Sequence, residues 1–189
     1  HLDGRAIDKA VDILTKARRI EFFGFGASGI VARDAQQKFP LFDVPCGVEI
    51  DAHQQTMVAS MLQAGDLVVV ISNTGATASL IETARLARAS GATVLGLLGA
   101  RGPLAGQCDH VILAETLDNT SIYTPTTSRI AALAVIDILS TAVALRRGGD
   151  HVARFKAMKQ AAHRGRRLTV STWPSCAPPE TSCCCRSAP

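Results

Sequence analysis

Two short loops carry the residue types that could do chemistry. The first is Gly24-Phe-Gly-Ala-Ser28, and the second is Ser72-Asn-Thr-Gly-Ala-Thr77. Each follows an apolar run and opens a helical pattern. At a helix N-terminus, unpaired backbone N–H groups and the helix dipole favour an anion, and hydroxyl groups can add hydrogen bonds. The two loops therefore predict a phosphate-binding site.

The predicted phosphate-binding residues combine small side chains with hydroxyl and amide donors. They are Gly26, Ser28, Ser72, Asn73, Thr74, Gly75 and Thr77. Serine, threonine and asparagine also cap helices without binding any ligand. Three hydroxyls within six residues, together with a glycine that lets the backbone approach closely, exceed what one cap requires, so phosphate binding is the favoured interpretation.

A dinucleotide site is the first alternative for the first loop. Gly24, Gly26 and Gly29 match the pattern G-x-G-x-x-G, and Glu49 follows Gly29 by 20 residues. In nicotinamide enzymes such a loop binds the pyrophosphate, and the acidic residue binds the ribose. The hydroxyl-rich second loop would have no role in that site, so we expect neither a nicotinamide nor any other cofactor.

Five apolar runs typical of buried strands alternate with helical patterns. The strands are expected at 19–25, 44–50, 67–71, 93–98 and 110–114, and the main helices at 3–17, 28–39, 52–62, 77–90 and 130–145. This alternation predicts an α/β fold: a three-layer α-β-α sandwich with a five-stranded parallel sheet, doubly wound as in flavodoxin. Ligands of such sheets bind beyond the carboxyl ends of the strands, where both loops lie.

The positive charge of the chain lies in its C-terminal part. The total is +4, but residues 1–145 carry a net charge of −3 and residues 146–189 carry +7. We expect one domain over 1–147, a basic helix over 148–170 and a disordered tail over 171–189. The basic helix could contact phosphates nonspecifically, but a solvated basic face is the favoured interpretation.

The tail differs from the rest of the chain in composition. Four of the eight prolines and the run Cys183-Cys-Cys185 fall within it, which suggests a shifted reading frame or a cloning artefact. Adjacent cysteines lack the two-residue spacing of zinc sites, so no metal site is expected.

The apolar segment 130–145 is 16 residues long and contains Asp137, which favours a buried helix over a membrane span. We expect a cytoplasmic protein without a membrane partner.

The two loops resemble those of sugar isomerase (SIS) domains, which bind phosphosugars. Further matches are Asp34-Ala-Gln-Gln-Lys-Phe39, Asp51-Ala-His-Gln-Gln55, Ile122-Tyr-Thr-Pro-Thr-Thr-Ser-Arg129 and Ala144-Leu-Arg-Arg147. This set is similar to the effector domains of RpiR-type transcriptional regulators, and within them to the HexR-like branch. The resemblance covers about residues 3–147.

The resemblance implies a sensor of hexose catabolism. Its effector would be a phosphorylated sugar or keto acid such as 2-keto-3-deoxy-6-phosphogluconate, and residues 119–128, with Tyr123 and Ser128, would shape the sugar end of the pocket. Binding would weaken the grip of an N-terminal helix-turn-helix module on operator DNA. That module is missing from residues 1–189.

The resemblance also implies a homodimer or homotetramer, with the first helix and the helix at 130–145 as interface candidates. Some relatives are fused to a glucokinase.

An aldose–ketose phosphosugar isomerase is the alternative from a different class. That reaction needs a base that moves a proton between adjacent carbons. The candidate bases near strand ends are Glu49, Asp51, His53, Glu82 and Glu115, of which His53 and Glu115 are also weaker candidates for the pocket. Each also fits a structural role, so no catalytic residue is assigned and the sensor is favoured.

Overall fold

The computed structural model describes residues 2–116 and 126–170, with side chains described as far as residue 164. The tail predicted over 171–189 lies outside these residues. A five-stranded parallel sheet lies at the centre, in the order β2-β1-β3-β4-β5. The strands are β1 (Arg19–Phe23), β2 (Cys46–Glu49), β3 (Asp66–Ser72), β4 (Thr93–Leu98) and β5 (His110–Leu113). The predicted α/β fold with five parallel strands is confirmed.

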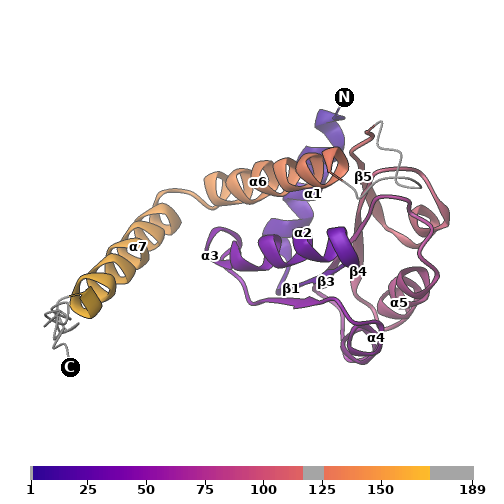
Figure 1. Cartoon of the computed structure of the whole chain (residues 1–189), viewed down its shortest axis with the longest axis horizontal. Helices are drawn as coiled ribbons and strands as arrows, with labels where there is room; N and C mark the ends of the chain where they lie inside the picture. Colours follow the sequence, from indigo (N-terminus) through magenta and orange to yellow (C-terminus); the bar gives the residue numbers. More distant parts are fainter. Residues whose placement is uncertain (1, 117–125, 171–189) are drawn as a thin grey trace, which may run out of the picture. The chain divides into compact units, whose positions relative to one another are not determined.

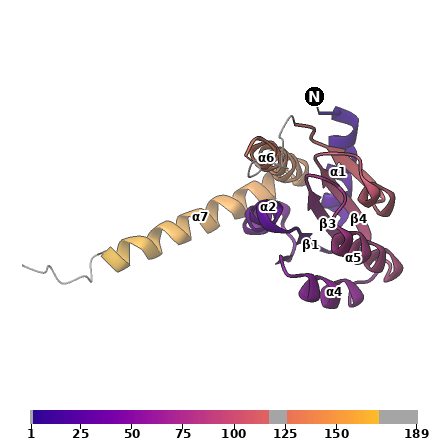
Figure 2. The same cartoon turned by 45° about the vertical axis from the view of Figure 1, so that its right-hand side comes forward.

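Helices alternate with the strands and cover both faces of the sheet (Figures 1 and 2). The described helices are α1 (Gly4–Lys16), α2 (Gly26–Gln37), α3 (Phe39–Phe42), α4 (Ala52–Ser60), α5 (Ala78–Ala89), the 3-10 helix η1 (Pro103–Gln107), α6 (Thr127–Arg147) and α7 (Gly149–Val170). Residues 1–155 and 156–189 form two compact units, and the sheet belongs to the first.

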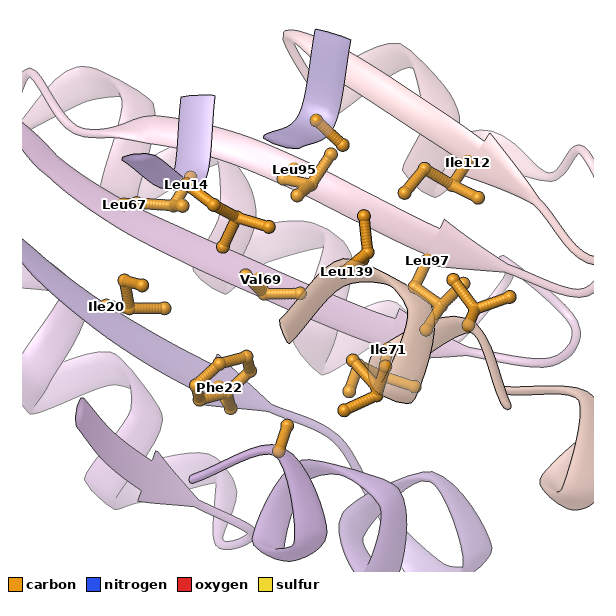
Figure 3. Close-up of a cluster of buried hydrophobic side chains, with 14 of the residues drawn as sticks. Leu14, Ile20, Phe22, Leu67, Val69, Ile71, Leu95, Leu97, Ile112 and Leu139 are labelled. Atoms are coloured by element: carbon orange, nitrogen blue, oxygen red, sulfur yellow. The ribbon is translucent and has the colours of Figure 1, made fainter. Parts of the chain in front are cut away.

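Successive apolar side chains along the strands point to opposite faces of the sheet and form two separate cores. Leu14 of α1 and Leu139 of α6 pack with Phe22, Val69 and Leu95 on one face (Figure 3). Leu80 of α5 and Leu104 of η1 pack with strand residues of the other face. All seven residues of β3 are buried, which explains why its sequence is a continuous apolar run rather than an alternating one.

Two helices differ from the sequence-based expectation. The helix predicted over 28–39 is divided, because α2 ends at Gln37 and the short α3 starts at Phe39 with Pro40 in its first turn. Proline lacks an N–H and fits only the first turn of a helix, so a new helix starts there.

Helix α6 has 21 residues, more than the predicted 16, and by length and composition alone it could cross a membrane. Its buried residues pack against the sheet, as in a core helix.

One carboxylate is buried near the β2 edge of the sheet. Glu21 of β1 is 2% exposed, and Arg19 Nε donates a hydrogen bond to Glu21 Oε1 at 2.5 Å. Burial disfavours the charged carboxylate and outweighs the Arg19 contact, so the pKa of Glu21 is raised above its ordinary value of 4.5.

We expect Glu21→Gln to reduce the pH dependence of stability. The folded chain binds more protons than the unfolded chain just above pH 4.5, because the pKa of Glu21 is raised in the fold. The contribution of Glu21 to stability therefore falls as the pH rises through that window. The substituted amide would keep an acceptor for Arg19 without the charge. Urea unfolding from about pH 4 to pH 7 should give a flatter stability curve for the variant, and parallel curves would contradict the assignment.

Candidate functional site

A pocket open to solvent lies at the carboxyl ends of β1, β3, β4 and β5. It is lined by loop residues, by strand ends and by the first turns of helices. The described lining comprises Phe25, Ala27, Ser28, Val31, Ile71, Ser72, Asn73, Thr74, Thr77, Leu97, Leu98, Gly99, Ala114, Ser128, Arg129 and Ala132.

The loop after β3 is held by hydrogen bonds to its own hydroxyl groups. The backbone N–H of Gly75 donates to Ser72 Oγ at 3.1 Å, and that of Ala76 donates to Thr74 Oγ1 at 3.3 Å. Gly75 has a φ of 63°, a left-handed conformation that a residue with a side chain rarely adopts. Because each hydroxyl accepts with a lone pair, its own hydrogen can still be donated to a ligand.

The loop between β4 and η1 supports the loop after β3. The N–H of Gly99 donates to Ser72 O at 3.0 Å, and the N–H of Leu104 donates to Gly75 O at 2.9 Å. A Cβ on Gly102 would come within 2.4 Å of Gly75 O, a backbone atom that cannot move aside easily. This support was not predicted from the sequence. Its signal was the pair of glycines that follows the fourth apolar run.

Two helices begin at the pocket without a side-chain cap. The N-cap residues of α2 and α5 are Phe25 and Thr77, and neither side chain makes a capping hydrogen bond. In contrast, Asp3 caps α1 and Asp51 caps α4, and neither lies in the described lining. The first N–H groups and dipoles of α2 and α5 are thus available to an anion in the pocket.

Arg129 adds a positive side chain at the start of α6. It is the only Lys, Arg, His, Asp or Glu in the described lining, and no ion pair joins it to a carboxylate of the described residues. A guanidinium binds carboxylate and phosphate groups with paired hydrogen bonds. In the sequence, Arg129 stands out only as the last residue of a family motif, because no spacing relates it to the two loops.

The structure brings together most of the predicted phosphate-binding residues. Ser28, Ser72, Asn73, Thr74 and Thr77 line the pocket. Ser128, a weaker candidate, lines it as well. Gly26 and Gly75 are outside the lining but belong to its loops: Gly26 begins α2, and Gly75 gives the second loop its turn.

The other candidates lie elsewhere or are not described. His53 is exposed on α4 and Glu115 is exposed after β5, and neither is in the described lining. Tyr123 lies outside the described residues. Among the candidate bases, Asp51 caps α4 and Glu82 pairs with Arg85 on the surface of α5. Glu49 also lies outside the described lining. Sequence proximity to strand ends was therefore insufficient to place these side chains in the pocket.

Cysteine and metal chemistry have no support in the described part of the chain. Burial raises the pKa of both Cys46 and Cys108 to about 12, so neither thiol is a nucleophile near neutral pH. Within residues 2–116 and 126–170, no three side chains of His, Cys, Asp or Glu are grouped as metal ligands would be.

Known proteins with a similar sequence or fold include transcriptional regulators. The HTH-type transcriptional regulator HexR of Pseudomonas aeruginosa is 48% identical over 160 residues, which cover 85% of this chain and 56% of HexR. The bifunctional protein glk of Burkholderia thailandensis is 35% identical over 84% of this chain and 25% of its own length. This chain therefore spans about half of the first relative and a quarter of the second.

The fold is shared with a solved structure that contains a phosphosugar. The Vibrio vulnificus NanR protein complexed with ManNAc-6P matches with a TM-score of 0.73 and 21% identity, over 92% of this chain and 64% of NanR. Residues 13–142 match the family described as the SIS domain, which accounts for the sheet, both loops and most of α6. This chain therefore belongs to the SIS domain family.

Proposed function

We propose that this SIS domain is the effector-sensing part of a HexR/RpiR-type transcriptional regulator of sugar catabolism. It binds a phosphorylated sugar or keto acid, and binding controls an N-terminal helix-turn-helix module that contacts operator DNA. The observation that carries the proposal is the convergence of two uncapped helix N-termini, those of α2 and α5, and several hydroxyl groups on one pocket. The identity to HexR supports the regulatory role.

The phosphate is proposed to lie on the two loops, between the starts of α2 and α5. Ser72, Thr74 and Thr77 donate hydroxyl hydrogen bonds from one side, and Ser28 donates from the other. The rest of the ligand extends towards α6, where Ser128 and Arg129 line the pocket. This placement leaves the guanidinium for a second acidic or polar group of the ligand.

Homo-oligomerisation and a cytoplasmic location are part of the same proposal. Support for an oligomer is a stripe of exposed apolar side chains along α6, formed by Ile130, Ile138 and Leu145. Fusion to a glucokinase is a further option for the full-length protein, because the bifunctional protein glk is among the relatives. None of these three features is needed for the pocket to bind its ligand.

An isomerase is the second candidate, and the described lining gives it little support. It contains no Asp, Glu, His or Lys that could act as the general base of proton transfer between adjacent carbons. Turnover of fructose 6-phosphate or arabinose 5-phosphate by the purified chain would favour the isomerase, whereas binding without turnover would favour the sensor.

We expect Arg129→Leu to weaken binding of a phosphorylated sugar acid more than binding of a sugar phosphate that has no carboxylate. A hydrogen bond to a charged group contributes about 1.5–3 kcal/mol, so the loss should be roughly 10- to 100-fold for 6-phosphogluconate. Glucose 6-phosphate lacks the carboxylate and should lose less. Calorimetry with both ligands measures the difference.

Arg101→Leu is the matched control for this experiment. Arg101 is exposed in the loop after β4, near the pocket but outside its described lining. It should leave both affinities unchanged. Equal losses for both ligands in Arg129→Leu would place Arg129 on the phosphate instead and contradict the assignment.

A further inference from the structure

Helix α6 connects the pocket to α1. Ser128 and Arg129 line the pocket from the first turn of α6, and Arg146 and Arg147 contact α1 from its last turn. Arg129 and Arg146 are 17 residues apart in a continuous helix, which corresponds to about 25 Å along its axis. One rigid element thus has one end at the ligand site and the other end on the first helix of the chain.

The contact of α6 with α1 leaves one guanidinium incompletely paired. Arg146 pairs with Asp12 and lies 4.0 Å from Asp8, so it takes both carboxylates that α1 presents. Arg147 Nη2 donates to the carbonyl of Thr15 at 3.1 Å, in the last turn of α1. The Nε of Arg147 is buried and has no hydrogen-bond partner among the described residues. A buried donor without a partner is costly, and a small movement of α6 could give it one.

Helices α1 and α6 contribute to one packed core, so a movement of one is expected to move the other. Leu14 of α1 and Leu139 of α6 belong to the same buried cluster, so both helices pack side chain against side chain over the sheet (Figure 3). Helices packed in this way respond to ligands by shifts of about 1–2 Å along or around their axes. A shift at Arg129 would therefore reach Arg146 and Arg147.

We propose that α6 couples occupancy of the pocket to the position of α1, through competition of Arg146 and Arg147 for the acceptors on α1. This inference rests on the proposed function, since the ligand is the anion that the pocket is proposed to bind. In this proposal α6 has two positions relative to α1. The ligand attracts Arg129 and the first turn of α6 more strongly in one position than in the other, and this difference is the differential affinity that such coupling requires. In the second position, Arg147 pairs with a carboxylate of α1 that Arg146 holds in the first.

Hydrogen exchange measured by mass spectrometry on the whole chain tests this coupling. The probe is saturating 2-keto-3-deoxy-6-phosphogluconate. It should slow exchange in peptides that cover 72–80 and 126–132, and it should change exchange in peptides that cover 4–16 by at least twofold. In the double variant Arg146→Gln/Arg147→Gln, the pocket peptides should still be protected at saturating ligand, while the response of 4–16 is lost. Arg147→Lys alone, which keeps the charge, is the fallback if the double variant does not fold, and it should reduce the response.

Arg85→Gln is the matched control, because Arg85 pairs only with Glu82 on the surface of α5 among the described residues. It should keep the full response of 4–16. An unchanged exchange of 4–16 in the parent chain, despite protection of the pocket peptides, would overturn the coupling and leave the proposed function intact. A response of 4–16 that persists in the double variant would overturn the role of the two arginines. If the probe protects no pocket peptide, the proposed function itself fails.

Discussion

Replacing Thr74 and Thr77 together by alanine is expected to weaken binding of 2-keto-3-deoxy-6-phosphogluconate by at least 100-fold. Each hydroxyl is proposed to donate a hydrogen bond to a charged phosphate oxygen, and such bonds contribute about 1.5–3 kcal/mol each. Two of them correspond to a factor of 100 or more in the dissociation constant. Calorimetric titration of the double variant measures the loss directly.

The same double variant should remain folded. Thr77 is the N-cap residue of α5, but its side chain makes no capping hydrogen bond, so its loss should cost less than the usual ~1 kcal/mol for a cap. Thr74 accepts one bond at 3.3 Å, from the N–H of Ala76, in an exposed loop. We expect a melting temperature within a few degrees of the parent.

Thr56→Ala is the control for this pair. Thr56 is exposed on α4, and its hydroxyl donates to the carbonyl of Ala52 one turn earlier. Its replacement removes a hydroxyl of the same kind far from the described lining. It should bind as the parent does, and an equal affinity in the Thr74/Thr77 double variant would refute the phosphate assignment.

Gly102→Ala is expected to have the second largest effect, because it disrupts the support of the loop after β3. The added Cβ would lie 2.4 Å from Gly75 O and 2.8 Å from Thr74 O, both backbone atoms. The two loops must therefore separate. Overpacking of this kind typically costs about 1–3 kcal/mol. A displaced loop also moves Thr74, so the affinity for 2-keto-3-deoxy-6-phosphogluconate should fall at least tenfold.

Gly106→Ala separates this effect from the general cost of replacing a glycine. Gly106 lies in η1, a few residues further on, and a Cβ there would meet no atom within 4 Å. Its stability and affinity should match those of the parent, as judged by urea unfolding and calorimetry. If Gly102→Ala behaves like Gly106→Ala, the loop between β4 and η1 does not position the site.

The fold and the two loops of the candidate site could be predicted from the sequence, because each loop directly follows its strand along the chain. The apolar run at 67–71 and the loop Ser72–Thr77 are consecutive, so strand, turn and hydroxyl groups could be read together. The same holds for the loop that leads to Ser28. Parallel strands bring their carboxyl ends to one edge, which is why two separate loops could be assigned to one pocket.

The rest of the site depends on contacts between distant segments. Arg129 reaches the pocket only because α6 crosses the sheet and begins beside the loops, 52 residues after Thr77 in the sequence. Gly102 matters only because the loop after β4 packs against Gly75. By contrast, the exposed position of Glu82 follows from the amphipathic pattern of its helix. No periodicity in the sequence identifies Arg129 or Gly102, because the packing of the elements decides their positions.

Phosphate recognition by the two loops is tested best by comparing one ligand with and without its phosphate. Calorimetric titration of the purified chain with 2-keto-3-deoxy-6-phosphogluconate and with 2-keto-3-deoxygluconate isolates the contribution of that group. If the converging helix N-termini and hydroxyl groups hold the phosphate, the phosphorylated compound binds and the unphosphorylated compound binds at least 100-fold more weakly. Equal affinities for the two compounds would show that the loops do not hold a phosphate.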